Sequence, residues 1–352
     1  MVNHLQHLVS TLDTQNMLAH LTQFPRQLQT AYDLAGSHEY HVKVDEIRQV
    51  VVLGMGGSAI GGEMSVGLSH DYGKVPFFIF RNYRVPVWVD EHTLVVAVSY
   101  SGNTEETLSA LNQAVKNHAP FLAITSGGKL AEAAKKAGAD VIQVPGGLPP
   151  RAAFGYLFLA QLTAYWKLGL MNLPMDEWIG DIVEEAEFNL HPLLPENVGG
   201  RAFELARALE NNLPIIYTGP GILAPVGIRW KGQISENAKM LAYHNVYPEM
   251  NHNEIVGWRQ MPELLSRIVV IHLQDEDDDE RVTLRMDKTG RMISRLSGGI
   301  YYLQSHGVNV ISRILSLVQL GDFISYYLAL LNREDPTPVV AIDELKAYLA
   351  AV

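Results

Sequence analysis

Short apolar runs without alternation recur along the first half of the chain, and segments with helical spacing separate them. The runs that fit strands buried on both faces are 49–53, 75–80, 94–98, 120–125 and 140–144. The helical segments between them are 59–68, 104–116 and 129–137. Parallel strands covered by helices on both faces produce this pattern. The sequence therefore predicts an open α/β sheet with right-handed crossovers.

The second half repeats this order of elements more faintly. A strand is predicted over 214–218, and Gly219, Pro220 and Gly221 then lead into a helical run that continues to Leu241. Later strands are predicted at 266–273 and 292–296, and later helices at 278–287, 308–331 and 342–351. The repeated strand, glycine turn and helix indicate an internal duplication.

We therefore predict an α/β protein of two similar units, each a parallel sheet flanked by helices. The first unit spans residues 1–170, with an N-terminal helix over 13–34 and a closing helix over 152–168. The second spans 171–352 and is reached through a polar, proline-containing bridge over 172–197. A chain of 352 residues is long enough for two such domains.

Composition narrows the classes of function. The net charge of −11 argues against a nucleic-acid or anionic-membrane partner, so an anionic ligand must be captured locally. The chain contains no cysteine, which excludes disulfides and thiolate chemistry and fits the cytoplasm. The apolar stretch 308–331 is interrupted by Arg313, Gln319 and Asp322, which predicts a buried helix rather than a membrane span.

Glycines stand where the first strand passes into a helix. Backbone amides at Gly56 and Gly57 can face an anion there, since a helix N-terminus carries free N–H groups. Gly54, Gly56 and Ala59 also fit a dinucleotide fingerprint, but 77–82 lacks the acidic ribose ligand and contains Arg81. An NADP site and a turn without ligand both remain open.

Hydroxyl side chains crowd the turn after the next strand. Ser99, Ser101 and Thr104 precede a helix whose first turn carries two glutamates. Hydroxyls combined with helix N-terminal amides suit a compact phosphate monoester. Ordinary helix capping is the alternative interpretation of the same residues.

These two turns, Gly56-Gly57-Ser58 and 99–107, resemble the sugar isomerase (SIS) domain, a flavodoxin-like phosphosugar fold. Four further segments resemble the bifunctional phosphoglucose/phosphomannose isomerase family, and the likeness spans nearly the whole chain. They are Pro150-Arg151-Ala152, 235–239, 251–257 and 343–346. The resemblance implies an aldose–ketose isomerase that interconverts glucose 6-phosphate, and mannose 6-phosphate, with fructose 6-phosphate.

The resemblance also implies a role for each matching residue. Glu236 is the expected base, Arg151 the stabiliser of an enediolate, and His252 and Lys346 the ring-opening pair. His252 is expected to come from the neighbouring subunit of a homodimer, its ring oriented by the asparagines on either side. The phosphate is expected to be held by Gly56, Gly57, Ser58, Ser99, Ser101 and Thr104.

Some features depart from this pattern or compete with it. Ser235 stands where relatives commonly have asparagine, and Thr337 is the candidate for the small hydroxyl residue associated with mannose 6-phosphate. The acidic block 275–280 is interpreted as a solvated loop and helix start, because consecutive side chains diverge. No metal and no cofactor are expected. A non-catalytic phosphosugar sensor, which would not need Glu236, and an NADP-linked oxidoreductase are the rival functions.

Overall fold

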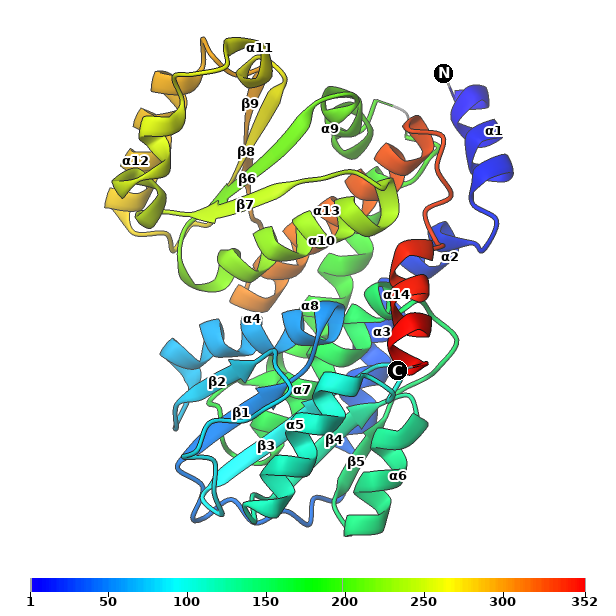
Figure 1. The fold of residues 1–352 in the computed structure, drawn as a ribbon, viewed down its shortest axis with the longest axis vertical. Helices are drawn as coiled ribbons and strands as arrows, with labels where there is room; N and C mark the ends of the chain where they lie inside the picture. The colour runs from blue at the N-terminus through cyan, green and yellow to red at the C-terminus, as the bar shows by residue number, and fades with distance from the viewer. Residues whose placement is uncertain (1, 198, 352) are drawn as a thin grey trace.

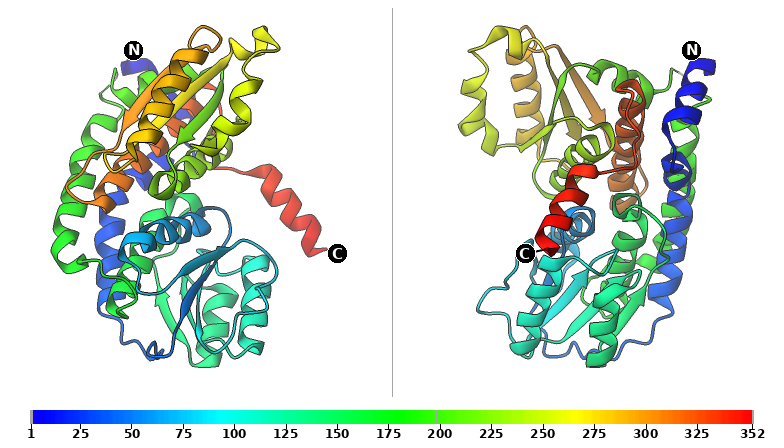
Figure 2. Two further views of the ribbon diagram at one scale, coloured as in Figure 1. Left: turned by 90° about the vertical axis from the view of Figure 1, so that its left-hand side faces the viewer. Right: turned by 45° about the vertical axis from the view of Figure 1, so that its right-hand side comes forward.

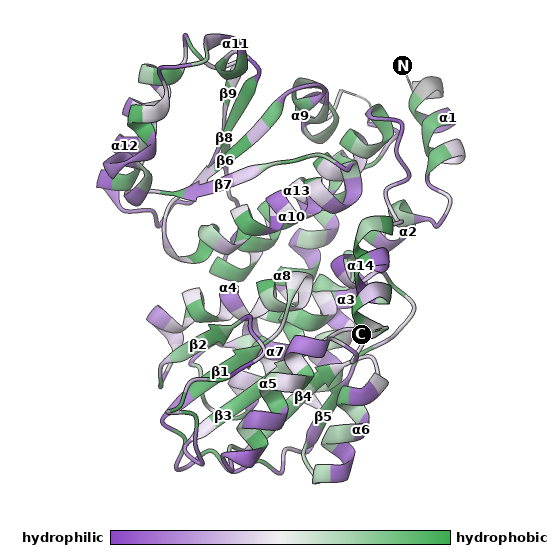
Figure 3. Ribbon diagram, viewed as in Figure 1, coloured by the Kyte–Doolittle hydropathy of each residue, from purple (hydrophilic) through white to green (hydrophobic). Residues whose placement is uncertain are grey.

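Two parallel sheets frame the part of the chain that the structure, a computed structural model, describes, residues 2–197 and 199–351. Helices α4 (Gly56–Tyr72), α10 (Ala224–Ala238) and α13 (Val310–Leu331) lie between the sheets (Figure 1). The central strands of the first sheet are largely green in the hydropathy view because they are buried on both faces (Figure 3). The predicted fold class, two parallel sheets flanked by helices, is confirmed.

The first sheet has the strand order β2-β1-β3-β4-β5, with every neighbouring pair parallel. This is the flavodoxin-like order: β2 is added on one side of β1, and β3, β4 and β5 follow on the other side, so the switch point lies between β1 and β3. Ligands of open sheets bind outside the carboxyl ends of the strands at that switch point. The strands are β1 (Gln49–Leu53), β2 (Phe77–Phe80), β3 (Thr93–Val98), β4 (Phe121–Thr125) and β5 (Asp140–Gln143).

The second sheet has the order β7-β6-β8-β9, again entirely parallel. Its strands are β6 (Leu213–Thr218), β7 (Tyr243–Val246), β8 (Ile268–Gln274) and β9 (Gly299–Gln304). The strand predicted at 292–296 is wrong, because Ile293 ends a helix and the strand follows at Gly299. The prediction also missed β7, because its residues lie at the exposed edge of the sheet and do not form an apolar run.

The helices that cover the first sheet differ on its two faces. α5 and α6 pack on one face through alanines and leucines, and α3, α4 and α7 pack on the other. In the first half of the chain the helices are α1 (Val2–Leu12), α2 (Met17–Thr22), α3 (Phe24–Gly36), α4 (Gly56–Tyr72), α5 (Glu105–Lys116), α6 (Gly128–Ala137), the 3-10 turn η1 (Pro150–Ala152) and α7 (Phe154–Lys167).

The remaining helices surround the second sheet and end in a projecting arm. α14 leaves the body of the molecule in the left view of Figure 2. These helices are α8 (Met175–Leu190), α9 (Arg201–Leu209), α10 (Ala224–Ala238), α11 (Pro262–Leu265), α12 (Glu280–Ile293), α13 (Val310–Leu331) and α14 (Val340–Ala350), with 3-10 turns η2 (His191–Leu193), η3 (Gly221–Leu223), η4 (Glu249–His252) and η5 (Glu254–Gly257).

Two predictions about the helical layer are corrected. The bridge predicted over 172–197 contains α8, which buries Ile182 and Ala186 four residues apart on one face. The single N-terminal helix predicted over 13–34 is instead divided into α2 and α3, and Pro25 stands in the first turn of α3.

The stretch 308–331 forms α13, the central helix of the second unit. Among the described residues α13 alone is long and apolar enough to cross a membrane, and 94% of its most apolar 18-residue stretch is buried inside the protein. The predicted buried helix is therefore confirmed. Its two charged side chains are paired inside the molecule: Asp322 binds Arg229, and Arg313 contacts the acidic block 275–280 at the end of β8.

That acidic block is only partly the predicted solvated loop. Asp275 is buried and accepts hydrogen bonds from Arg313 Nε at 3.1 Å and from the Ser305 hydroxyl. Arg313 also pairs with Glu276 and Asp277. The helix start is confirmed, since α12 begins at Glu280. The buried arginine explains why acidic residues accumulate here, because a cation removed from water needs several acceptors.

The crossing of α10 and α13 depends on one residue without a side chain. A Cβ placed on Gly321 would stand 2.2 Å from the indole Nε1 of Trp230. Trp230 is itself fully buried and donates to the carbonyl oxygen of Leu317 at 2.8 Å. The two helices therefore approach closely only because Gly321 leaves room for this ring.

We predict that Gly321→Ala lowers the free energy of unfolding by about 1–3 kcal/mol, as expected for overpacking in a dense core. Gly180→Ala is the control, because Gly180 lies within α8 and a Cβ there meets nothing within 4 Å. That substitution is expected to stabilise by about 0.5–1 kcal/mol. Urea denaturation of both variants gives the comparison, and an unchanged midpoint for Gly321→Ala would contradict this account.

Candidate active site

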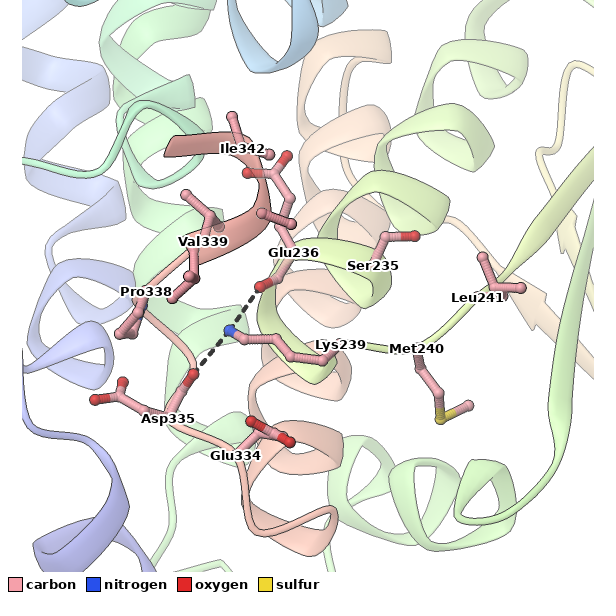
Figure 4. A pocket seen from close by; sticks show the side chains of 12 residues that line it. Ser235, Glu236, Lys239, Met240, Leu241, Glu334, Asp335, Pro338, Val339 and Ile342 are labelled. Atoms are coloured by element: carbon pink, nitrogen blue, oxygen red, sulfur yellow. Dashed lines mark hydrogen bonds between the residues drawn. The ribbon is translucent and has the colours of Figure 1, made fainter. Parts of the chain in front are cut away.

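Glu236 lies in the last turn of α10, where the helices of the two sheets meet. Its side chain is 30% exposed, and Oε2 is 3.5 Å from Nη1 of Arg151. In Figure 4 the carboxylate points toward the first turn of α14. The group therefore faces a sheltered space beside a cation rather than bulk water.

Arg151 is a buried cation with a fixed orientation. Only 4% of its side chain is exposed. Nε donates to Asn237 Oδ1 at 2.6 Å, and Nη2 donates to the carbonyl oxygens of Pro336 and Thr337 at 2.6 and 2.7 Å. Burial lowers the pKa of Arg151, which the negative charge of Glu236 opposes. A guanidinium remains charged under such conditions, so Nη1 presents a permanent cation to Glu236.

A second buried arginine supports the first. Arg229 on α10 makes a two-pronged pair with Asp322 on α13, at 3.0 and 2.7 Å, and Gln233 donates to the same carboxylate at 2.8 Å. Arg229 Nη2 also donates to the backbone carbonyl of Arg151 at 3.0 Å. The backbone of Arg151 is thereby tied to the helix that carries Glu236.

The glycine turn at the end of β1 lies against Arg151. Gly56 has φ +49°, a left-handed conformation that favours glycine, and α4 begins there. A Cβ on Gly57 would lie 3.4 Å from the Cα of Arg151. Ser58 in turn accepts a hydrogen bond from the Tyr100 amide at 3.3 Å. The glycine turn therefore links Arg151 to the loop after β3.

The loop after β3 carries the three predicted hydroxyl residues, and two of them are in direct contact. Ser99 and Thr104 share a hydrogen bond at 2.8 Å, and Ser99 Oγ accepts from the Gly102 amide at 3.1 Å. Ser101 is exposed and its Oγ accepts from the Asn103 amide at 3.3 Å. Thr104 directly precedes α5 without a side-chain cap bond, so simple capping by Thr104 does not explain the cluster.

Two cavities adjoin Glu236. The smaller, about 200 Å³, lies between the glycine turn and α10, and Gly56, Gly57, Arg151, Gln233 and Glu236 contribute to its wall. The larger, about 670 Å³, lies between the end of α10 and the start of α14 (Figure 4). The structure thus brings Arg151, Glu236 and two of the glycines expected at the phosphate site to one cavity. Ser58, Ser99, Ser101 and Thr104 lie in the adjoining turns, outside the wall of either cavity.

His252 and Lys346 are exposed and lie outside both of these cavities. His252 ends the short turn η4 beyond β7, and Lys346 stands on the projecting helix α14. Within one chain, the described residues therefore place only Glu236 and Arg151 of the four expected catalytic groups together.

The asparagines beside His252 do not hold its ring. Asn251 donates to Thr289 at 3.0 Å, while Asn253 donates to Glu249 and accepts from the Glu254 amide. The expectation that these side chains orient the imidazole is therefore wrong for a single chain, because their polar atoms bind the surrounding loop and α12 instead.

Sequence reasoning missed the contribution of Asn237 and the position of Lys239. Asn237 is fully buried and donates to Ser325 while accepting from Arg151. Lys239 donates to the backbone carbonyls of Glu236 and Asp335, both at 2.8 Å (Figure 4). The sequence signal for this role is a lysine directly after a helix, where its ammonium can bind the last carbonyl oxygens of that helix. Burial lowers the pKa of Lys239.

Thr337 and Ser235 occupy different surroundings. Thr337 is buried and its carbonyl oxygen binds Arg151, while it contributes to neither cavity beside Glu236. Ser235 lines the larger cavity. Thr337, the candidate residue for mannose 6-phosphate, therefore contacts the guanidinium of Arg151 through its backbone carbonyl and not through its hydroxyl.

Arg81, on which the NADP alternative depended, is already paired. It lines the smaller cavity and its guanidinium contacts the carboxylate of Glu63 on α4. A guanidinium bound to a neighbouring carboxylate is a poor receptor for a 2′-phosphate, because the phosphate must displace that partner.

Comparisons with known proteins place this fold and site in a class. Residues 44–171 match the family model described as SIS domain, and residues 200–349 match that described as bacterial phospho-glucose isomerase C-terminal SIS domain. The chain is therefore a double SIS-domain protein of the phosphosugar isomerase type.

Curated relatives identify the family. A bifunctional phosphoglucose/phosphomannose isomerase of Caldicellulosiruptor bescii is 44% identical over 331 residues, 93% of this chain and 97% of that protein. Those of Aquifex aeolicus and Thermoplasma acidophilum are 38% and 34% identical, over 85% and 94% of this chain and 90% and 99% of theirs. The chain belongs to the bifunctional phosphoglucose/phosphomannose isomerase family.

Solved structures share the fold at low sequence identity. A hypothetical protein of Thermus thermophilus matches with TM-score 0.76 at 16% identity, covering 99% of this chain and 94% of its own. The C-terminal domain of glucosamine-fructose-6-phosphate aminotransferase from Francisella tularensis matches with TM-score 0.71 at 16% identity, covering 93% and 100%. Both likenesses concern the architecture alone.

Proposed function

We propose that this chain is an aldose–ketose isomerase that interconverts glucose 6-phosphate and mannose 6-phosphate with fructose 6-phosphate. The observation that carries this proposal is the Glu236 carboxylate facing a cavity 3.5 Å from the buried Arg151 guanidinium. Family membership supports the same activity. The reaction moves hydrogen within one substrate molecule, so the proposal includes no hydride carrier and no metal.

The phosphate is proposed to bind at the two turns of the first sheet. Free amides at the start of α4 and the hydroxyls of Ser99, Ser101 and Thr104 supply donors for a dianion. Gly56, Gly57 and Ser58 would complete this phosphate site. Because the glycine turn touches the backbone of Arg151, a phosphate held there sets the sugar carbons beside Glu236.

Proton transfer is proposed to be the work of Glu236. The carboxylate removes the C2 proton of the open-chain aldose and returns it to C1, through an enediolate shared by both aldoses. Arg151 stabilises the negative oxygens that develop, since a fixed cation in a sheltered site costs no reorganisation during reaction. Asn237 holds the guanidinium through Nε.

Ring opening is proposed to use His252 and Lys346 in a homodimer. Both residues are exposed and lie outside the cavities beside Glu236 in one chain, and His252 would come from the partner subunit. α14 supports this assembly because Ile342, Leu345 and Tyr348 are each at least 40% exposed along it. We place the enzyme in the cytoplasm, in sugar-phosphate metabolism.

We predict that fructose 6-phosphate incubated with the protein in D₂O yields glucose 6-phosphate labelled at C2, with mannose 6-phosphate as a second product, measured by NMR. Glu236→Gln should bind substrate and form neither. Substrate binding by the wild type without conversion would instead favour the sensor function. Product formation that requires added NADPH would favour the oxidoreductase.

We predict that Arg151→Lys lowers kcat by about a hundredfold while KM changes much less. Lysine keeps the positive charge, but its ammonium cannot bind Asn237 and the two carbonyl oxygens and also face Glu236. The variant therefore loses stabilisation of the transition state more than binding of the substrate. Arg207→Lys is the control, because Arg207 forms an exposed ion pair with Glu204 on α9. Full turnover of Arg151→Lys would exclude the proposed role.

We predict that mixing inactive Glu236→Gln with inactive His252→Ala restores activity after subunit exchange. Each hybrid dimer then contains one site with both native groups, so random exchange should recover about a quarter of wild-type activity per chain. Exchange is followed with differently tagged chains. Hybrid dimers that stay inactive would show that His252 does not act across subunits.

A further inference from the structure

We propose that Glu254 is the positioning residue for His252, holding the loop that carries the imidazole against the second sheet. This inference rests on the proposed function, in which His252 opens the sugar ring. Glu254 lies two residues beyond His252 and begins the short turn η5. None of the roles proposed above uses this carboxylate.

Both oxygens of Glu254 are engaged by the sheet. Oε1 accepts from the hydroxyl of Tyr217 on β6, and Oε2 accepts from the side-chain amide of Asn245 on β7. An ionised carboxylate has only acceptors, so it matches two donors and forms strong charge-assisted bonds. One side chain therefore ties the loop to two neighbouring strands.

Tyr217 makes this attachment rigid. Its side chain is fully buried, and its hydroxyl also accepts from the indole of Trp258 at 3.2 Å. Trp258 directly follows η5, so the loop meets Tyr217 at both ends of that turn. Burial and the neighbouring carboxylate raise the pKa of Tyr217, which keeps the hydroxyl protonated as a donor.

The other flank of His252 is attached to α12. Asn251 donates to Thr289, which is 2% exposed, at 3.0 Å. His252 itself is exposed, and its side chain forms no hydrogen bond among the described residues. Its position is therefore set by the backbone between residues 251 and 254, and a displacement of the Glu254 anchor moves the imidazole directly.

Glu254→Gln cannot keep both charge-assisted bonds. If its amide nitrogen faces Asn245, two donors meet, and Asn245 cannot turn its amide because Asn245 Oδ1 already accepts from the Val246 amide at 2.8 Å. If it faces Tyr217, the bond reverses onto a hydroxyl that already accepts from Trp258, and the buried tyrosine proton loses its acceptor. The substitution therefore keeps size and backbone while weakening one attachment. A misplacement of about 1 Å is enough to cost a catalytic step on the order of a hundredfold.

The test compares two substrates with the full-length wild-type and variant enzymes. Fructose 6-phosphate must be opened before proton transfer, whereas 5-deoxyfructose 6-phosphate lacks the hydroxyl that closes the furanose ring and stays open. We expect Glu254→Gln to lower kcat on fructose 6-phosphate by at least about tenfold and to leave kcat on the open-chain analogue nearly unchanged. His252→Ala should show the same selectivity with a larger loss.

Glu249→Gln is the matched control. Glu249 belongs to the adjoining turn, is exposed, and its side chain accepts a hydrogen bond from Asn253 within the loop. Glutamine can keep that bond, so kcat on both substrates should be unchanged. Tyr217→Phe removes one donor to Glu254 and should repeat the selective loss more weakly. Circular dichroism and thermal unfolding establish that each variant is folded.

The outcomes separate this inference from the proposed function. If Glu254→Gln behaves like wild type while His252→Ala is selective, positioning by Glu254 is wrong. If Glu254→Gln lowers kcat on both substrates equally, the residue is merely structural and the inference also fails. If His252→Ala itself shows no selectivity, the ring-opening role of His252 fails, and the inference falls with it.

Discussion

The buried guanidinium of Arg151 is the constraint on which the site depends. A cation removed from water needs acceptors on every side, and here they come from separate segments: Asn237, the carbonyl oxygens of 336 and 337, and Glu236. The turn η1, beyond the last strand of the first sheet, supplies the arginine, while α10 and the bend before α14 supply the acceptors. The hydrogen bonds that this one guanidinium requires therefore hold the two units in position around the cavity.

This arrangement is also compatible with the phosphate site proposed for an acidic protein. With a net charge of −11 the overall field repels anions, so attraction must be local and short-ranged. The buried pair of Arg229 and Asp322 is nearly neutral and serves as a support. Arg151 remains the cation nearest to Glu236, and the backbone amides of the glycine turn supply partial positive charge without a side chain.

The strands of the first sheet were predictable because they are buried on both faces and lack alternation. β7 and β9 were not, since their side chains are half exposed or exposed and carry no such signal. Glu236 and Arg151 were recognisable from short motifs. The carbonyl oxygens that hold Arg151 come from positions 336 and 337, far along the chain, and no local pattern reports a contact made by backbone atoms of a distant segment.

The proposed division of labour links activity to assembly. Glu236 and Arg151 are held by contacts inside one chain, so the proton-transfer half of the site exists in a single subunit. His252 and Lys346 stand on an exposed loop and an exposed helix, and the ring-opening half is proposed to form only when two copies meet. By mass action, dilution below the dimer dissociation constant then removes ring opening first, while the preorganised pair of Arg151 and Glu236 persists.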